Sequence, residues 1–153
     1  MATIHLLVGT TMGASEYIAD ALVPYIEEAG FSTHIHNPPN LAALPYDEAH
    51  IWLVVTSTHG AGDYPESIVE FATQLAQQQP NLRGLPYAVI ALGDSSYDTF
   101  CEAGLKMDNQ LQQLGAVQTA DPLTIDIQAY PIPEDAAEQW IPQWLNQLTQ
   151  YQK

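Results

Sequence analysis

Basic residues are nearly missing from this 153-residue chain, which has 3 lysines and arginines against 18 aspartates and glutamates and a formal net charge of -15 at pH 7. A protein that follows nucleic-acid phosphates needs a stripe of basic side chains, so we expect no nucleic-acid partner. The same field repels anionic lipid surfaces, and we expect no membrane partner either. It would attract proteins with a basic surface, although an acidic surface that only keeps a protein soluble would have the same composition.

Cysteine and long apolar runs are also scarce. The single cysteine, Cys101, has no intramolecular disulfide partner. No apolar run approaches the length of about 18 residues that spans a bilayer, and residues 1–8 lack the basic residues of a signal peptide. These absences predict a cytoplasmic protein. The hydrophobic content of 46% is nevertheless sufficient for a core, and the length predicts one domain over residues 1–153.

Apolar runs and amphipathic segments alternate along the chain. The pattern predicts strands at 3–8, 31–36, 50–56, 87–92 and 123–127. It predicts helices after residue 15, after Pro65, over 101–114 and over 135–151, with Pro24 and Pro142 expected to kink or interrupt two of them. Such alternation predicts an α/β fold: a three-layer sandwich around a five-stranded parallel sheet. Five units fit the strand order 2-1-3-4-5.

Loops rich in glycine, serine and threonine follow the first, third and fourth predicted strands, where this kind of fold binds ligands. The loop at 9–15 precedes a helix, and backbone N–H groups together with hydroxyls there can hold a phosphate monoester without a cation. No lysine follows its glycine, so it is not a Walker loop, and G-x-G-x-x-G is absent. A capped helix start with no ligand remains the alternative.

The other two loops combine flat rings with carboxylates. His59 and Tyr97 can lie against an aromatic ligand, and Asp63, Asp94 and Asp98 lie in the same loops. An ordinary loop histidine is the alternative for His59.

The segments 57–63 (STHGAGD) and 92–97 (LGDSSY), the latter continuing to Phe100 and Cys101, resemble those of short-chain flavodoxins. The similarity is to the MioC-like group and to the FMN domains of diflavin reductases such as sulfite reductase flavoprotein. In the first loop Thr10, Gly13 and Ser15 fit the family pattern, whereas Met12 stands where a threonine is usual. The resemblance implies a single flavodoxin-like domain with FMN as its cofactor, and an electron-transfer protein rather than an enzyme.

The resemblance also implies which residues bind FMN. The phosphate would be held by the first loop: Thr10, Thr11, Met12, Gly13, Ala14 and Ser15. The isoalloxazine ring would lie between Ser57, Thr58, His59 and Gly60 on one side and Leu92, Gly93, Asp94, Ser95, Tyr97, Phe100 and Cys101 on the other, with Tyr97 stacked on the outer face. Asp126 is expected near the ribityl chain.

These features predict a low-potential one-electron carrier between a flavoprotein reductase and acceptor enzymes. A non-redox FMN-binding regulatory or interaction module is the alternative. A receiver-like phosphoacceptor shares the strand order but needs acidic residues after strands one and three, where this chain has hydroxyls. His34 and His36 alternate on one strand face, yet two histidines do not complete a zinc site, so we predict no metal and no catalytic residue.

Overall fold

The computed structural model describes residues 2–10, 13–46, 50–59, 62–96 and 101–151. Its centre is a parallel sheet made of the strands β1 (Thr3–Gly9), β2 (Ser32–His36), β3 (His50–Thr56), β4 (Pro86–Gly93), β5 (Val117–Gln118) and β6 (Leu123–Asp126). The strand order is β2-β1-β3-β4-β5, with β6 also paired to β4. The predicted order 2-1-3-4-5 is confirmed.

The outermost position beside β4 is shared by two short strands rather than one. β5 pairs with the start of β4 and β6 with its end, from Ile90 to Gly93. Between them lies Pro122, which has no N–H to donate to a neighbouring strand. β6 matches the predicted strand at 123–127, whereas β5 has only two residues and leaves no periodic pattern.

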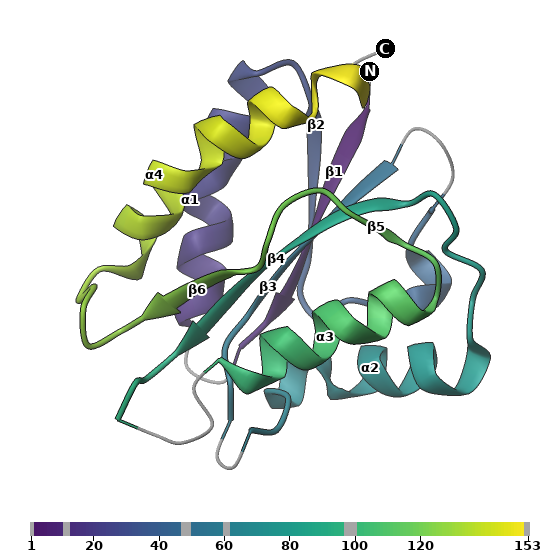
Figure 1. Ribbon diagram of the computed structural model, residues 1–153, viewed down its shortest axis with the longest axis horizontal. Helices are drawn as coiled ribbons and strands as arrows, with labels where there is room; N and C mark the ends of the chain where they lie inside the picture. The colour runs from purple at the N-terminus through teal and green to yellow at the C-terminus, as the bar shows by residue number, and fades with distance from the viewer. Residues whose placement is uncertain (1, 11–12, 47–49, 60–61, 97–100, 152–153) are drawn as a thin grey trace.

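Helices cover both faces of the sheet, as the three-layer prediction requires (Figure 1). α1 (Ala14–Glu28) and α4 (Pro133–Gln147) share one apolar core with alternate residues of β1, β3 and β4, including Ile4, Leu6 and Val8. α2 (Glu66–Gln78) and α3 (Glu102–Gln113) share a second core on the other face, with Leu7, Trp52 and Val54. Two short 3-10 helices lie at Leu41–Ala43 and Thr149–Tyr151.

The prolines inside α1 and α4 do not end these helices. Pro24 and Pro142 both lie on exposed positions within helices of 15 residues. Each removes one backbone hydrogen bond, but water can reach the carbonyl that is left without its partner. Of the two outcomes expected at Pro142, an interruption of the helix is therefore wrong: α4 begins at Pro133 and continues past it.

The layered arrangement brings the carboxyl ends of β1, β3, β4 and β6 to one edge of the sheet (Figure 1). We call this edge, with the loop residues that follow the four strands, the rim.

Across the described residues, no helix has both the length and the apolar character needed to cross a bilayer.

Candidate functional site

Described parts of all three predicted loops lie at the rim. Ser57 N–H donates to the Gly9 carbonyl over 3.1 Å, which ties the second loop to the first. Gly9 is buried, and a Cβ there would overlap Thr56 Oγ1 and lie 2.9 Å from Ile68 Cγ2. The first two loops therefore leave the sheet in close contact, and only a glycine fits at this point.

The first loop closes on itself where it enters α1. Gly13 N–H donates to Thr10 Oγ1 over 2.7 Å, and Thr10 N–H donates to Ser67 Oγ of α2 over 2.8 Å. Gly13 precedes the helix with φ +93°, a conformation that favours glycine. The predicted residues Thr11 and Met12 lie outside the described residues. The loop is thus held in place from both sides, by its own hydroxyl and by α2.

The side-chain hydroxyl of Ser15 lies buried at the start of α1. Its side chain is fully buried, and Oγ makes no hydrogen bond within the described part of the chain. A buried hydroxyl left unpaired costs about 1–3 kcal/mol, so such atoms are rare. Ser15 is the second residue of α1, where the helix also offers free backbone N–H groups and positive potential. This donor set suits a phosphate oxygen, and the residues present fit the phosphate of FMN.

The second loop forms a narrow hairpin. His59 and Asp63 exchange two backbone hydrogen bonds of 2.8 Å, and both residues are exposed. Thr58 Oγ1 accepts a hydrogen bond from Ala103 N–H at the start of α3 over 3.2 Å. Gly60 lies outside the described residues. The hairpin therefore stands at the rim, joined to α3 at its base.

The third loop is joined to the end of β6 by carboxylates. Asp94 accepts from the backbone and hydroxyl of Ser96 over 2.9 and 2.6 Å, and from Gln128 Nε2 over 3.1 Å. Asp126 accepts from the backbone N–H groups of Ser95 and Gln128 over 3.1 and 2.9 Å. These bonds lower the pKa of both carboxyls, chiefly through Ser96 for Asp94 and Ser95 for Asp126. Both therefore stay ionised and make this side of the rim negative.

Two residues predicted for the third loop direct their side chains into the protein. Leu92 belongs to the core under α1 and α4. The Cys101 thiol is buried and donates to the Ala91 carbonyl over 3.2 Å, and burial raises its pKa to about 11. The thiol is therefore protonated at neutral pH and is no nucleophile. Tyr97 and Phe100 lie outside the described residues.

The rim brings together most of the predicted residues that the structure describes: Thr10, Gly13, Ala14, Ser15, Ser57, Thr58, His59, Gly93, Asp94 and Ser95. Sequence reasoning missed three residues that hold these loops: Ser67, Lys106 and Gln128. Each comes from a helix or turn that follows a different strand. No local pattern in the sequence marks such contacts, because they exist only once the helices lie on the sheet.

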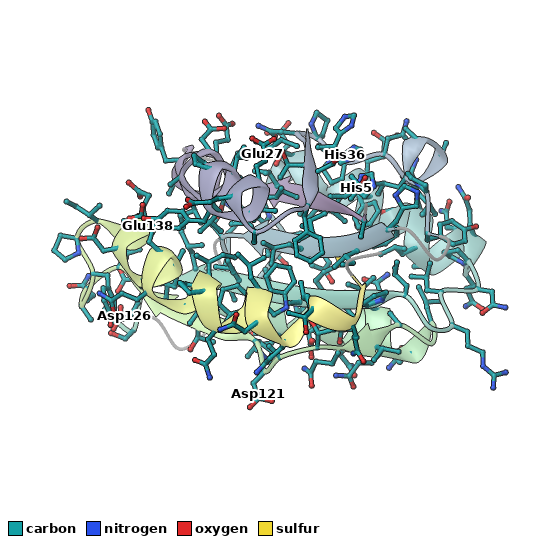
Figure 2. The ribbon with its side chains drawn as sticks, turned by 90° about the horizontal axis from the view of Figure 1, so that it is seen from above. His5, Glu27, His36, Asp121, Asp126 and Glu138 are labelled. Carbon is teal, nitrogen blue, oxygen red and sulfur yellow. The ribbon has the colours of Figure 1, made fainter. Side chains whose placement is uncertain are left out.

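A second polar cluster lies away from the rim, on the sheet face that α2 and α3 cover. Besides His34 and His36 it contains His5 and His50, which the sequence analysis did not connect to them. His5 Nδ1 lies 2.9 Å from His36 Nε2, and His5 Nε2 lies 2.8 Å from His50 Nδ1. His34 stacks on His36 with ring centroids 4.3 Å apart, and Figure 2 shows His5 beside His36.

These rings are arranged as a hydrogen-bonded chain. The two nitrogens of His5 are directed at two different histidines, so they do not converge on one point. Within the described ranges, no group of three or more histidine, cysteine or acidic side chains is placed to hold a metal ion. Burial, and then the neighbouring rings, lower the pKa of His5 to about 4, and burial with His34 does the same for His36. We define these four residues as the histidine cluster.

Comparisons of the sequence with known proteins find the family that the loop motifs resemble. The sequence model of the Flavodoxin family matches residues 6–140. The Protein MioC of Escherichia coli K12 is 44% identical over 148 residues, which is 97% of this chain and 99% of that protein. The sulfite reductase [NADPH] flavoprotein alpha-component of a Shewanella species is 34% identical over 139 residues, 90% of this chain but 22% of that protein.

A solved flavodoxin structure has the same fold as this chain. A mutant flavodoxin from Pseudomonas aeruginosa superposes with a TM-score of 0.87 at 30% identity, covering 95% of this chain and 98% of that one. The expected similarity to MioC and to diflavin reductases is confirmed. Flavodoxins are electron-transfer proteins that bind FMN. By sequence match over most of its length and by strand order, this chain belongs to the flavodoxin family.

Proposed function

We propose that this protein carries single electrons from a flavoprotein reductase to an acceptor enzyme, with FMN bound at the rim. Membership of the flavodoxin family supports the proposal. The observation that carries it is the buried Ser15 hydroxyl, which has no partner among the described residues and lies at the amino end of α1. A phosphate at this point would accept the hydrogen bond that the protein leaves unmade.

The first loop would hold the phosphate without any basic side chain. Ser15 Oγ and the free N–H groups of the first turn of α1 are the donors, and Thr10 Oγ1 keeps Gly13 in place beneath them. Binding a phosphate through a hydroxyl and backbone N–H groups is consistent with a chain that has three lysines and arginines in all. The other predicted FMN residues of the two neighbouring loops, from Ser57 to Gly60 and from Gly93 to Phe100, would enclose the ring, whereas the side chains of Leu92 and Cys101 are directed into the protein.

The charge of the rim would set the reduction potential. FMN supplies one-electron chemistry at a ring that becomes anionic when fully reduced. The rim presents Asp63, Asp94 and Asp126, and the pKa of the latter two is lowered. One fixed negative charge at about 10 Å disfavours an anion by roughly 15–35 mV per electron, before screening by salt. Together these carboxylates would keep the second one-electron potential low.

The same surface suggests what kind of partner docks. Ile127, Tyr130 and Ile132 follow β6 at the rim and are 43%, 38% and 55% exposed. Carboxylates border them, among them Asp126 before and Glu134 after. A redox partner with an apolar centre and a basic border would match this surface, because opposite charges speed and orient the encounter. This supports flavoprotein reductases and acceptor enzymes with basic surfaces as partners.

An anaerobic redox titration of the FMN-loaded protein tests the proposal. We expect tight 1:1 FMN binding, a second one-electron potential below that of free FMN, and rapid reduction by a flavoprotein reductase that slows as salt is raised. A second potential no lower than that of free FMN would contradict the carrier role. FMN binding without electron exchange with any reductase would instead favour a regulatory module.

A further inference from the structure

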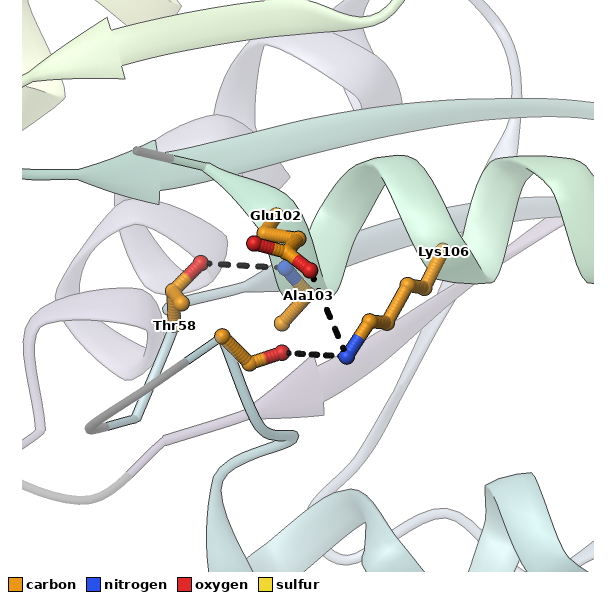
Figure 3. A network of polar contacts seen from close by, with 5 residues as sticks. Thr58, Glu102, Ala103 and Lys106 are labelled. Carbon is orange, nitrogen blue, oxygen red and sulfur yellow. Dashed lines mark hydrogen bonds and ion pairs between the residues drawn. The ribbon is translucent and has the colours of Figure 1, made fainter. Parts of the chain in front are cut away.

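The start of α3 donates two hydrogen bonds to the second loop (Figure 3). Ala103 N–H donates to Thr58 Oγ1 over 3.2 Å, and Lys106 Nζ donates to the Gly62 carbonyl over 2.8 Å. Gly62 itself lies against Glu102, because a Cβ on Gly62 would come within 2.7 Å of the Glu102 carboxylate. α3 therefore contacts the 59–63 hairpin at its base and along its returning arm.

Lys106 is an unusual residue for this place. Of the three lysines and arginines in the sequence, it is the one that contacts a rim loop within the described part of the chain. Arg83 lies beside Gly115, away from the rim, and within the described residues its backbone N–H donates to Asn81 Oδ1. The Asp and Glu side chains are the charged ones that the described rim loops carry. Among the described residues, Lys106 therefore brings a positive charge to the second loop from α3.

The Gly62 carbonyl is the more important of the two acceptors of Lys106. The distance to Glu102 Oε1 is 3.7 Å and both side chains are 44% exposed, so that ion pair is weak. The bond to Gly62 is shorter, has a charged donor and ends on a buried residue. The hairpin has only the two His59–Asp63 bonds to hold its arms together in the described structure. The hydrogen bond from Lys106 Nζ is a third contact, made from outside the hairpin, and it therefore restricts the movement of Gly62 and its neighbours.

We infer that Lys106 is a positioning residue of the FMN site, which holds the 59–63 hairpin through the Gly62 carbonyl and adds one positive charge beside an acidic rim. The inference rests on the proposed function, since it concerns the fit of this hairpin to bound FMN. Two effects follow from the same contact. A hairpin that is already ordered loses less entropy when FMN binds, and a nearby cation favours an anionic ring.

Four single variants separate these effects from a change in overall charge. Lys106→Met removes the donor and the charge but keeps a flexible apolar stem. Lys106→Arg restores both. Arg83→Met makes the same change of charge far from the rim, and Glu102→Gln removes the ion pair while leaving the bond to Gly62. Thermal unfolding and amide exchange in β3 show that each variant is folded.

Amide hydrogen exchange of the FMN-free protein comes first. With Lys106→Met we expect the His59 and Asp63 amides to exchange about 10-fold faster, whereas Arg83→Met and Glu102→Gln should match the wild type. FMN titration by fluorescence should then give a Kd about 5-fold higher for Lys106→Met. The equilibrium constant of the second one-electron reduction should fall about 3-fold, or roughly 28 mV at 59 mV per factor of ten. Lys106→Arg should recover most of each effect.

Unchanged exchange at His59 and Asp63 in Lys106→Met would overturn the inference. So would faster exchange with an unchanged Kd and potential, because the lysine would then be merely structural. If the wild-type protein bound no FMN at all, the proposed function would fail, and the exchange measurement on the FMN-free protein would still decide whether Lys106 holds the hairpin.

Discussion

The rim and the histidine cluster are two polar regions on the same apolar sheet, and they satisfy their hydrogen bonds differently. In the histidine cluster, His5 uses both ring nitrogens on neighbouring histidines. At the rim, the Ser15 hydroxyl is buried and has no partner in the described structure. Because an unmade buried hydrogen bond is costly, the proposed FMN phosphate would give the Ser15 hydroxyl the acceptor that the described residues do not supply, whereas His5 already has its partners within the protein. Four experiments test this difference between the two regions.

The largest effect is expected from Gly9→Ala at the base of the rim. The new methyl group would overlap Thr56 Oγ1 and press on Ile68, and overpacking of this kind costs about 2–3 kcal/mol of unfolding free energy. Chemical denaturation of the FMN-free protein measures the loss. Gly84→Ala is the control, since nothing lies within 4 Å of its added Cβ although φ is +84°; it should cost about 1 kcal/mol. Equal losses would show that the rim is not closely packed.

The histidine cluster should make stability depend on pH. The pKa of His5 is about 4 in the folded protein and about 6.5 when unfolded, so the unfolded chain binds the proton more tightly. The contribution of His5 is therefore present above pH 6.5 and is lost as the pH falls toward 4, by about 2 kcal/mol between pH 7.5 and pH 5.

His5→Leu provides the comparison for this pH effect. Carboxylates also titrate in this range, so the informative quantity is the difference between the two proteins in how much free energy of unfolding each loses from pH 7.5 to pH 5. We expect the variant to lose less than the wild type. An identical loss in both proteins would mean that His5 is protonated without cost, and that the cluster does not behave as a buried neutral chain.

Ser15→Ala tests the unpaired hydroxyl directly. Without FMN, we expect the variant to be as stable as the wild type or more so by up to about 1 kcal/mol, because an unmade hydrogen bond is removed. With FMN, we expect the Kd to rise about 10-fold, or about 1.4 kcal/mol. Thr124→Ala, which removes an exposed hydroxyl from β6, should change neither. A loss of stability without FMN would show that the Ser15 hydroxyl is satisfied inside the protein.

The smallest effect is expected from Asp94→Asn. This variant removes one negative charge from the rim and keeps an acceptor oxygen for Ser96. The second one-electron potential of the FMN-loaded protein should rise by roughly 15–35 mV, and less at high salt. Asp121→Asn removes an equal charge from an exposed residue before β6 and should shift the potential less. Equal shifts would mean that net charge, not the rim, sets the potential.

The elements of the fold were predictable because their signals are local. A continuous apolar run marks β3 from His50 to Thr56, and helical spacing with a closing Gly30 marks α1. The meeting of the three loops at one edge of the sheet was also predictable, since glycine and hydroxyl residues follow strands whose carboxyl ends lie together, whereas the FMN contacts of these loops stay a prediction. β5 was missed because two residues form no periodic pattern. The cytoplasmic location of the protein stays a prediction.

Local patterns and composition were sufficient to predict the strands and helices, the acidic character and the loops that follow the strands, and the number of strand–helix units was sufficient to predict the strand order. Which distant side chains hold those loops, and which buried polar atoms lack a partner among the described residues, became visible in the folded protein alone. Lys106 reaches Gly62 across 44 residues, and His5 reaches His36 across 31 and His50 across 45. Such contacts depend on how helices and strands pack, and the free energy of an unpaired Ser15 hydroxyl exists only once the chain has buried it.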